Sequence, residues 1–184
     1  MDTAQLIALV VLVALAVAVA LFIRRGARLL YRTRIAEGFR GEALDLSRHV
    51  AHSLSEVAVL IDGVRRRDTD GEAIRGSLSA AREAVERYAD EARSLTTPVT
   101  AQATQVRMVE ELERAGRALE LVEHGCDLAR DGNRMARGPE ADTSIKRGYL
   151  NLVHARESFH ELVKVAIEQA EDASPVRNMG HRNR

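Results

Sequence analysis

The feature that most constrains this chain is an uninterrupted apolar run of 18 residues, LIALVVLVALAVAVALFI, from Leu6 to Ile23. A helix of this length spans roughly 27 Å at 1.5 Å per residue, close to the hydrocarbon thickness of a bilayer. Backbone amides inside lipid must bond within their own segment, so we expect the run to be helical. Residues 1–5 lack the Lys or Arg that begins a cleaved signal peptide. We therefore predict a single transmembrane helix over residues 6–23.

Charges on the two sides of this run predict its orientation. Residues 24–40 carry six arginines and one acid, whereas residues 1–5 carry only Asp2. By the positive-inside rule, we expect residues 1–5 outside a cell membrane and the rest of the chain in the cytoplasm. The basic segment 24–40 then lies at the bilayer surface, where it either only fixes the topology or also binds anionic headgroups. The candidate membrane-surface residues are Arg24, Arg25, Arg28 and Arg32.

The composition of the remaining chain excludes several functional classes. Residues 41–184 carry 21 basic and 25 acidic side chains, a net charge of −4 that argues against nucleic-acid binding. The single cysteine, Cys126, excludes a disulfide framework or a cysteine-based zinc finger. Aromatic residues make up only 3% of the chain, without Trp, so an aromatic-lined ligand pocket is not expected.

Sparse turn signals divide residues 41–173 into four predicted helices. Asp68 to Gly71 reads as a turn, Thr97-Pro98 as a helix start, and Asp131 to Pro139 as a longer loop. The predicted helices run approximately 41–67, 72–95, 98–131 and 139–173. The glycines between the membrane helix and the first of these weaken a helix without ending it, so the two can form one continuous helix. We expect residues 174–184 to be a disordered tail.

Each predicted helix carries an apolar stripe with alternating steps of three and four residues, which is typical of coiled-coil-like bundles. The stripes are Leu46, Val50, Leu54, Val57, Ile61 and Val64; Ile74, Leu78, Ala81, Val85, Tyr88, Ala92 and Leu95; Met108, Leu112, Ala115, Leu119, Val122, Cys126 and Ala129; and Ile145, Tyr149, Leu152, Phe159, Val163 and Ala166. Arg156 interrupts the last stripe, and we expect it to reach the bundle end or to pair with a carboxylate from another helix. Short connections favour antiparallel neighbours.

A second apolar pattern exceeds what a monomeric bundle needs. Leu121, Leu128 and Met135 recur every seven residues on the side opposite the stripe of their own helix, and Leu150 and Val165 also lie off their stripe. Exposed apolar stripes mark partner or self-association surfaces, so we predict that Leu121, Leu128 and Met135 bind a protein partner. The alternative is that these side chains are interior to a less simple bundle.

The stretch Val50 to Gly63 contains Ala51-His52-Ser53-Leu54 in a helix whose apolar stripe leaves His52 facing solvent. It resembles the phosphoacceptor helix of histidine phosphotransfer domains, in which an Ala-His-x-Leu core is followed by Lys-Gly. This resemblance covers about 14 residues and implies a helical relay module with His52 as candidate phosphoacceptor. The sequence departs from that pattern at Ser55 and Glu56, where the family has Lys and Gly, and the alternative interpretation is an ordinary surface histidine.

Other candidate chemistry is sparse. His49, His52 and Glu56 share one helix sector, and Glu157-x-x-His160 resembles half of a di-iron motif, but a second such motif is missing. We therefore expect no metal, no cofactor and no enzymatic activity, and we expect Cys126 to be a buried apolar residue.

The predicted protein is all-α: a single N-terminal transmembrane helix followed by a cytoplasmic antiparallel four-helix bundle. Its expected function is that of a membrane-anchored scaffold, adaptor or accessory subunit that contacts the lipid bilayer and either a protein partner or itself. The alternatives are a phosphorelay protein using His52 and a lipid-organising membrane protein.

Overall fold

The computed structural model describes the backbone of residues 3–130 and 134–172. It describes the side chains of residues 34–130 and 138–172, together with those of Val19 and Arg24. The helices are α1 (Thr3–Arg66), α2 (Gly71–Ser94), α3 (Gln102–Arg130) and α4 (Arg134–Asp172), with a short 3-10 helix η1 (Val99–Ala101) before α3. The predicted disordered tail at 174–184 lies outside the described residues.

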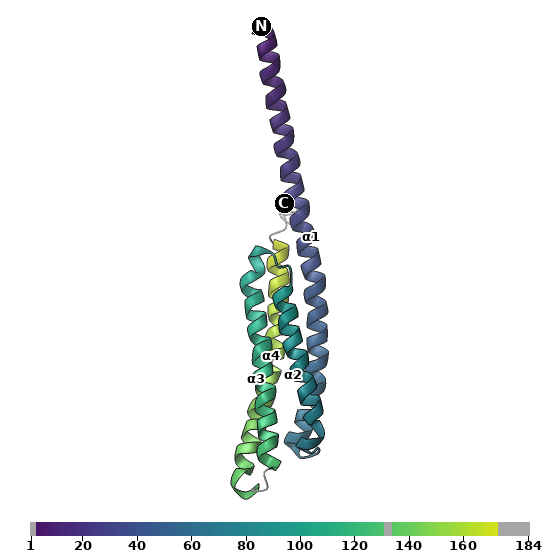
Figure 1. Ribbon diagram of the computed structural model, residues 1–184, viewed down its shortest axis with the longest axis vertical. Coiled ribbons are helices and arrows are strands. Elements are labelled where there is room, and N and C mark those ends of the chain that lie inside the picture. The colour runs from purple at the N-terminus through teal and green to yellow at the C-terminus, as the bar shows by residue number, and fades with distance from the viewer. Residues whose placement is uncertain (1–2, 131–133, 173–184) are drawn as a thin grey trace, which may run out of the picture.

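The helices form an antiparallel four-helix bundle, and the N-terminal part of α1 projects beyond it (Figure 1). Each helix packs against the next along the chain, and α4 returns to α1. Arg40, where α1 enters the bundle, contacts Glu171 at the end of α4, whereas Arg67, just after α1, contacts Asp142 near the start of α4. The all-helical, bundle-like fold class predicted from the stripes is thus confirmed.

The stripes form the core. Except for Val64, Tyr88, Tyr149 and Ala129, every stripe residue is buried, and the first three of these are partly buried against the core. Two phenylalanines, Phe39 on α1 and Phe159 on α4, are among the largest fully buried side chains. Burial of one face of each helix stabilises helices that would be marginal in isolation.

Helix α1 runs without a break from Thr3 to Arg66, so the apolar run and the first bundle helix are one element. Within the part of the chain whose side chains the structure describes, no helix is long and apolar enough to cross a membrane. The predicted transmembrane segment 6–23 falls, apart from Val19, outside those described side chains.

The turn between α1 and α2 forms where the sequence predicts it. The Asp68 amide donates to the Gly63 carbonyl at 2.9 Å and the Arg67 amide to the Val64 carbonyl at 3.0 Å, which closes the end of α1. This closure requires a left-handed residue, and Arg67 adopts it with φ of 67°. Asp70 then caps α2, because its carboxylate accepts from the Glu72 amide at 3.3 Å.

Two predicted helix starts differ from the structure. Thr97 does not cap a helix at Pro98: its hydroxyl donates back to the Leu95 carbonyl at 3.1 Å, and η1 precedes α3. The loop predicted up to Pro139 is shorter, because α4 already begins at Arg134 and includes Pro139. Pro139 is the sixth residue of α4, so its missing amide costs the helix one backbone hydrogen bond, to the carbonyl of residue 135, and α4 continues through it.

The four helix contacts are of different kinds. Helices α3 and α4 approach each other most closely: a Cβ at Gly125 would lie 2.7 Å from Ile145 Cγ1 and 3.0 Å from the Ala141 carbonyl oxygen. Helices α2 and α3 are linked by arginines on α2 and acids on α3, with Arg75–Asp127 at 2.6 Å and Arg93–Glu113 at 2.5 Å. Helices α1 and α4 share the apolar core and are also joined by polar contacts, Ser55–Arg156 and Ser47–His160.

Candidate functional site

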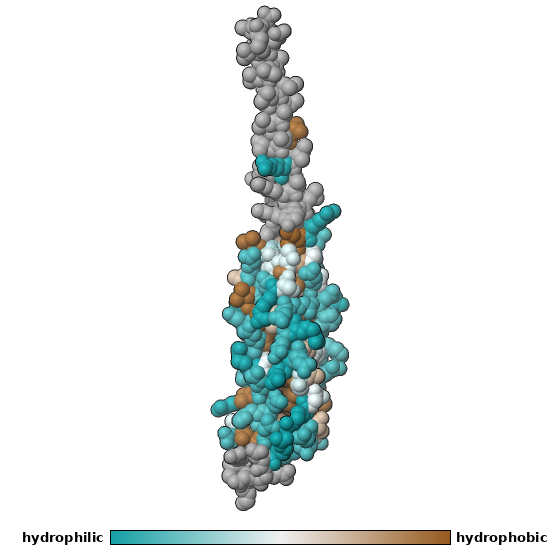
Figure 2. Space-filling model, viewed as in Figure 1, coloured by the Kyte–Doolittle hydropathy of each residue, from teal (hydrophilic) through white to brown (hydrophobic). Residues whose placement is uncertain are grey.

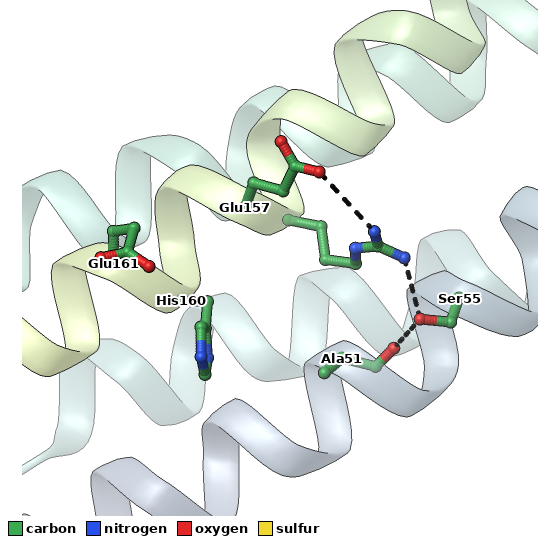
Figure 3. Close-up of a pocket in the computed structure, with 6 residues that line it drawn as sticks. Ala51, Ser55, Glu157, His160 and Glu161 are labelled. Atoms are coloured by element: carbon green, nitrogen blue, oxygen red, sulfur yellow. Dashed lines mark hydrogen bonds and ion pairs between the residues drawn. The ribbon is translucent and has the colours of Figure 1, made fainter.

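Side chains from α1 and α4, most of them polar, line an open groove on the bundle surface (Figure 3). Helix α1 contributes Ala51 and Ser55, which are one turn apart on the flank of its buried stripe. The residues from α4 are Arg156, Glu157, His160 and Glu161. Helical spacing of three to five residues explains why these side chains reach the same groove.

Arg156 is the central residue of this groove, and its side chain is 29% exposed. Its Nη1 donates to Ser55 Oγ at 2.9 Å, and the Ser55 hydroxyl donates to the Ala51 carbonyl at 2.5 Å. The other nitrogen, Nη2, lies 4.0 Å from Glu157 on the same helix. The expectation that Arg156 pairs with a carboxylate from another helix is therefore wrong: its partner on the other helix is a hydroxyl.

A second polar contact lies two turns away, between Ser47 and His160. Ser47 Oγ and His160 Nδ1 are 3.0 Å apart, and Ser47 is buried. A buried hydroxyl inside a packed helix cannot reach a substrate, so this pair is not suited to nucleophilic chemistry. Its physical effect is to satisfy a buried polar group and to fix the register of α1 against α4.

The charges in the groove are balanced. Lys164 Nζ is 2.7 Å from Glu161 Oε1, and this hydrogen bond holds the pKa of Glu161 below its ordinary range. The two cations, Arg156 and Lys164, offset the carboxylates of Glu157 and Glu161, which leaves little net attraction for an anion or a cation. We interpret the groove as a polar seam that orients α1 on α4.

The groove residues were missed by sequence reasoning, apart from Arg156 and the Glu157-x-x-His160 motif. A usable signal is present: Ser47 and Ser55 are eight residues apart on one side of the α1 stripe, and Arg156 and His160 are four apart on α4. Polar residues that recur at helical spacings beside the apolar stripes of two helices indicate a polar contact between those helices.

His52 is exposed as predicted, with 77% of its side chain accessible. Its Nε2 lies 3.4 Å from Glu56 Oε1, one turn along α1. The carboxylate stands beside the ring nitrogen that a phosphoryl group would approach. The role of His52 as phosphoacceptor stays a prediction.

The predicted partner stripe lies differently from the expectation. Leu121 and Leu128 are half-buried, and the side chain of Met135 lies outside the described residues. The cause is the close approach of α4 at Gly125, which is four residues after Leu121 and three before Leu128 on the same flank of α3. Leu121 and Leu128 therefore border α4, and are not on the open side opposite the stripe.

Other apolar side chains are more exposed. Figure 2 shows a mainly hydrophilic bundle surface interrupted by separate hydrophobic spots. The large hydrophobic residues exposed on the bundle are Leu44, Val59, Leu60, Val99, Val106, Leu150 and Val165. Leu150 and Val165 are the two that the sequence places off the α4 stripe.

The remaining predicted residues are only partly described. Arg24 is exposed, whereas the side chains of Arg25, Arg28 and Arg32 lie outside the description. In the described part of the chain, no three or more His, Cys, Asp or Glu side chains gather into a metal site.

Cys126 is buried on the α3 stripe, as expected. Gly71 packs against it so closely that a Cβ at position 71 would lie 2.9 Å from Cys126 Sγ. Burial, together with the nearby Asp127 carboxylate, raises the pKa of the thiol to about 11. A protonated, enclosed thiol is a poor nucleophile.

Comparisons with known proteins give no relative for this chain: no family model matches it, and neither do any curated protein or solved structure.

Proposed function

We propose that the chain is a single-pass membrane protein whose helical bundle acts as a binding platform, a scaffold or accessory subunit, on the cytoplasmic face. The observation that carries this proposal is the continuity of α1 from Thr3 to Arg66. An apolar run long enough for a bilayer and the first helix of the bundle share this element, so membrane insertion would fix the bundle at the surface.

The same continuity sets the height of the bundle. The apolar run ends at Ile23, and among the described side chains Ala36 is the first that is buried in the bundle. Thirteen residues of helix place the bundle about 20 Å beyond the end of the run. The arginines of segment 24–40 would lie along this stalk, near anionic headgroups. Tethering raises the effective concentration of the bundle for partners in the same membrane.

The anchor is tested by membrane extraction of the full chain. We expect the protein to stay in the membrane pellet after alkaline carbonate washing. Ala14→Arg combined with Ala18→Arg should release most of it, because each central arginine costs about 2.5–3.5 kcal/mol of insertion free energy. The matched control, Ala14→Leu with Ala18→Leu, should remain in the pellet. Release of the unmodified chain would refute the anchor.

The orientation is tested by cysteine accessibility. Ser77→Cys places a thiol on the exposed side of α2, and Thr3→Cys places one near the N-terminus. In intact cells, a membrane-impermeant maleimide should label the Thr3→Cys chain but not the Ser77→Cys chain. After lysis, it should also label the Ser77→Cys chain. The parent chain is a suitable background because its one cysteine is buried. Labelling of Ser77→Cys without lysis would reverse the proposed topology.

The binding role is tested with the full chain purified in mild detergent. Leu121 and Leu128 are half-buried and so still partly accessible, and together with Met135 they remain our candidates for contact with a protein partner. Leu121→Gln combined with Leu128→Gln should reduce recovery of a stoichiometric partner several-fold, whereas Leu60→Gln on α1 should not. Equal recovery with all variants would remove the candidate stripe but not the anchor.

A relay function is the second candidate, and the exposure of His52 on a helical bundle favours it. It predicts an acid-labile phosphate that His52→Ala removes and His49→Ala retains. An acid-labile phosphate that persists in the His52→Ala variant would exclude this function.

A lipid-organising function is the remaining alternative and depends on the basic segment. It predicts that a chain lacking residues 1–23 still binds anionic liposomes and loses this binding as salt is raised. Liposome binding that requires residues 1–23 would exclude it.

A further inference from the structure

The outer face of α4 carries a second stripe, on the side away from the core. Its members are exposed and are spaced by three or four residues along the helix, as in the buried stripes. Leu150 and Val165 are its apolar members and are 43% and 40% exposed. The central stripe is Arg147, Leu150, His154, Glu157, Glu161, Val165 and Glu168.

The stripe is nearly symmetric about the point between Glu157 and Ser158. Leu150 lies eight residues before Ser158, and Val165 lies eight residues after Glu157. A second copy of α4 running antiparallel, with a two-fold axis at this point, therefore places Leu150 opposite Val165 of the second copy. The two-fold axis generates the same Leu150–Val165 contact a second time, so each chain has both of its apolar residues covered by the other chain.

Most charges of the stripe follow the same symmetry, whereas Glu157 lies beside Glu157 of the second copy at the two-fold axis. Arg147 lies eleven residues before Ser158 and Glu168 eleven residues after Glu157, so they face each other across the antiparallel pair. His154 faces Glu161 by the same count. A parallel pair would instead place each of these residues opposite its own copy, and like charges in contact are destabilising.

From this match of apolar residues and charges, we propose that the outer face of α4 binds the same face of a second copy of this chain in antiparallel orientation. The interface is isologous, since one patch serves both chains. The pairing needs only α4, and it holds whether or not residues 6–23 span a membrane.

The pairing has a consequence that does rest on the proposed anchor. Antiparallel bundles direct their N-terminal extensions away from each other, because α1 leaves each bundle at the end where α4 finishes (Figure 1). Two anchored chains joined in this way would belong to two apposed membranes.

The pairing is tested by disulfide cross-linking of the full chain in mild detergent. Leu150→Cys and Val165→Cys chains carry different tags and are mixed before oxidation; the native Cys126 is buried and does not compete. We expect the mixed disulfide to dominate and each variant alone to give little covalent dimer. Efficient cross-linking of Leu150→Cys with itself would indicate a parallel pair and overturn the proposal. Cross-linking no stronger than that of a Leu60→Cys control on α1 would also overturn it.

A charge exchange gives an independent readout by light scattering. Arg147→Glu and Glu168→Arg should each weaken dimerisation at least roughly tenfold, since each creates two like-charge contacts in the dimer. Both substitutions in one chain should restore the dimer, because the charges then face each other with signs reversed. A monomeric parent chain, or a double variant as weak as the single variants, would refute the pairing. Neither result would bear on the carbonate extraction that tests the anchor.

Discussion

Gly148 on α4 faces Val122 on α3 so closely that a Cβ at position 148 would lie 2.5 Å from Val122 Cγ2. It would also lie 2.7 Å from the Ala118 carbonyl oxygen, which belongs to the backbone and cannot rotate away. The contact explains why a glycine stands inside a long helix, where it otherwise costs stability. The absence of one Cβ sets the distance between α3 and α4.

Gly148→Ala should therefore lower the free energy of unfolding by about 1–3 kcal/mol through overpacking. The measurement is thermal or urea unfolding of the full chain in mild detergent, followed by far-UV circular dichroism. Gly76→Ala on α2 is the matched control, since a Cβ there meets nothing within 4 Å. It should raise stability by about 0.5–1 kcal/mol. If both substitutions changed the free energy of unfolding in the same direction, the close α3–α4 contact would be contradicted.

Arg67→Gly should stabilise the chain, because Arg67 holds a φ of 67° that glycine adopts without strain. We expect a gain of about 1 kcal/mol in the free energy of unfolding. The lost ion pair with Asp142 is largely exposed and contributes little. Arg66→Gly, at the last residue of α1, replaces a residue without a positive φ, so it should bring no such gain and should destabilise slightly. A loss of stability in Arg67→Gly would show that this turn depends on the arginine side chain.

The thiol of Cys126 should make stability depend on pH in the alkaline range. Its pKa is raised from about 9 to about 11 in the folded chain, so the folded state binds more protons than the unfolded state between these values. Stability conferred by the neutral thiol is present below pH 9 and declines as pH rises toward 11. Urea unfolding at pH 8, 9 and 10 measures the decline. In Cys126→Ala the decline should be smaller, and an identical slope would assign it to other groups.

Arg75 and Asp127 should show a measurable coupling across α2 and α3. Their hydrogen bond of 2.6 Å is partly buried, and it raises the pKa of the guanidinium. A double-mutant cycle with Arg75→Gln and Asp127→Asn should give a favourable coupling that is larger than that of an exposed pair within one helix. The exposed pair Arg48–Asp45, within one helix, should give about 0.3 kcal/mol or less in the same cycle. Equal couplings would mean that the α2–α3 contacts do not align these helices.

The bundle could be predicted from the sequence because a stripe at three- and four-residue steps and its burial have the same physical cause. Ile74, Leu78 and Val85 illustrate this: their spacing places them on one face, and that face is the one that loses water. Turn chemistry was equally direct at Asp70, whose carboxylate caps the next helix.

The surroundings of the stripes could not be predicted in the same way. A helical wheel gives the angle of Leu121 but not the distance of the neighbouring helix, which depends on Gly125 and Gly148. The partner of Arg156 was missed because a hydroxyl such as that of Ser55 carries no charge by which to identify it. Pro139 reads as a helix breaker in a linear scan, yet it is tolerated close to the start of α4.

Because α1 is unbroken, the length of helix between the apolar run and the bundle also determines how the bundle is rotated about the helix axis. Each residue of an α-helix turns the chain by about 100° and advances it by about 1.5 Å. The direction in which each face of the bundle points, relative to the apolar run, is therefore set by the number of residues between Ile23 and Ala36. One residue inserted in this stretch would turn the outer face of α4 by more than a quarter of a circle, whereas seven inserted residues would return it to within about 20° of its original direction.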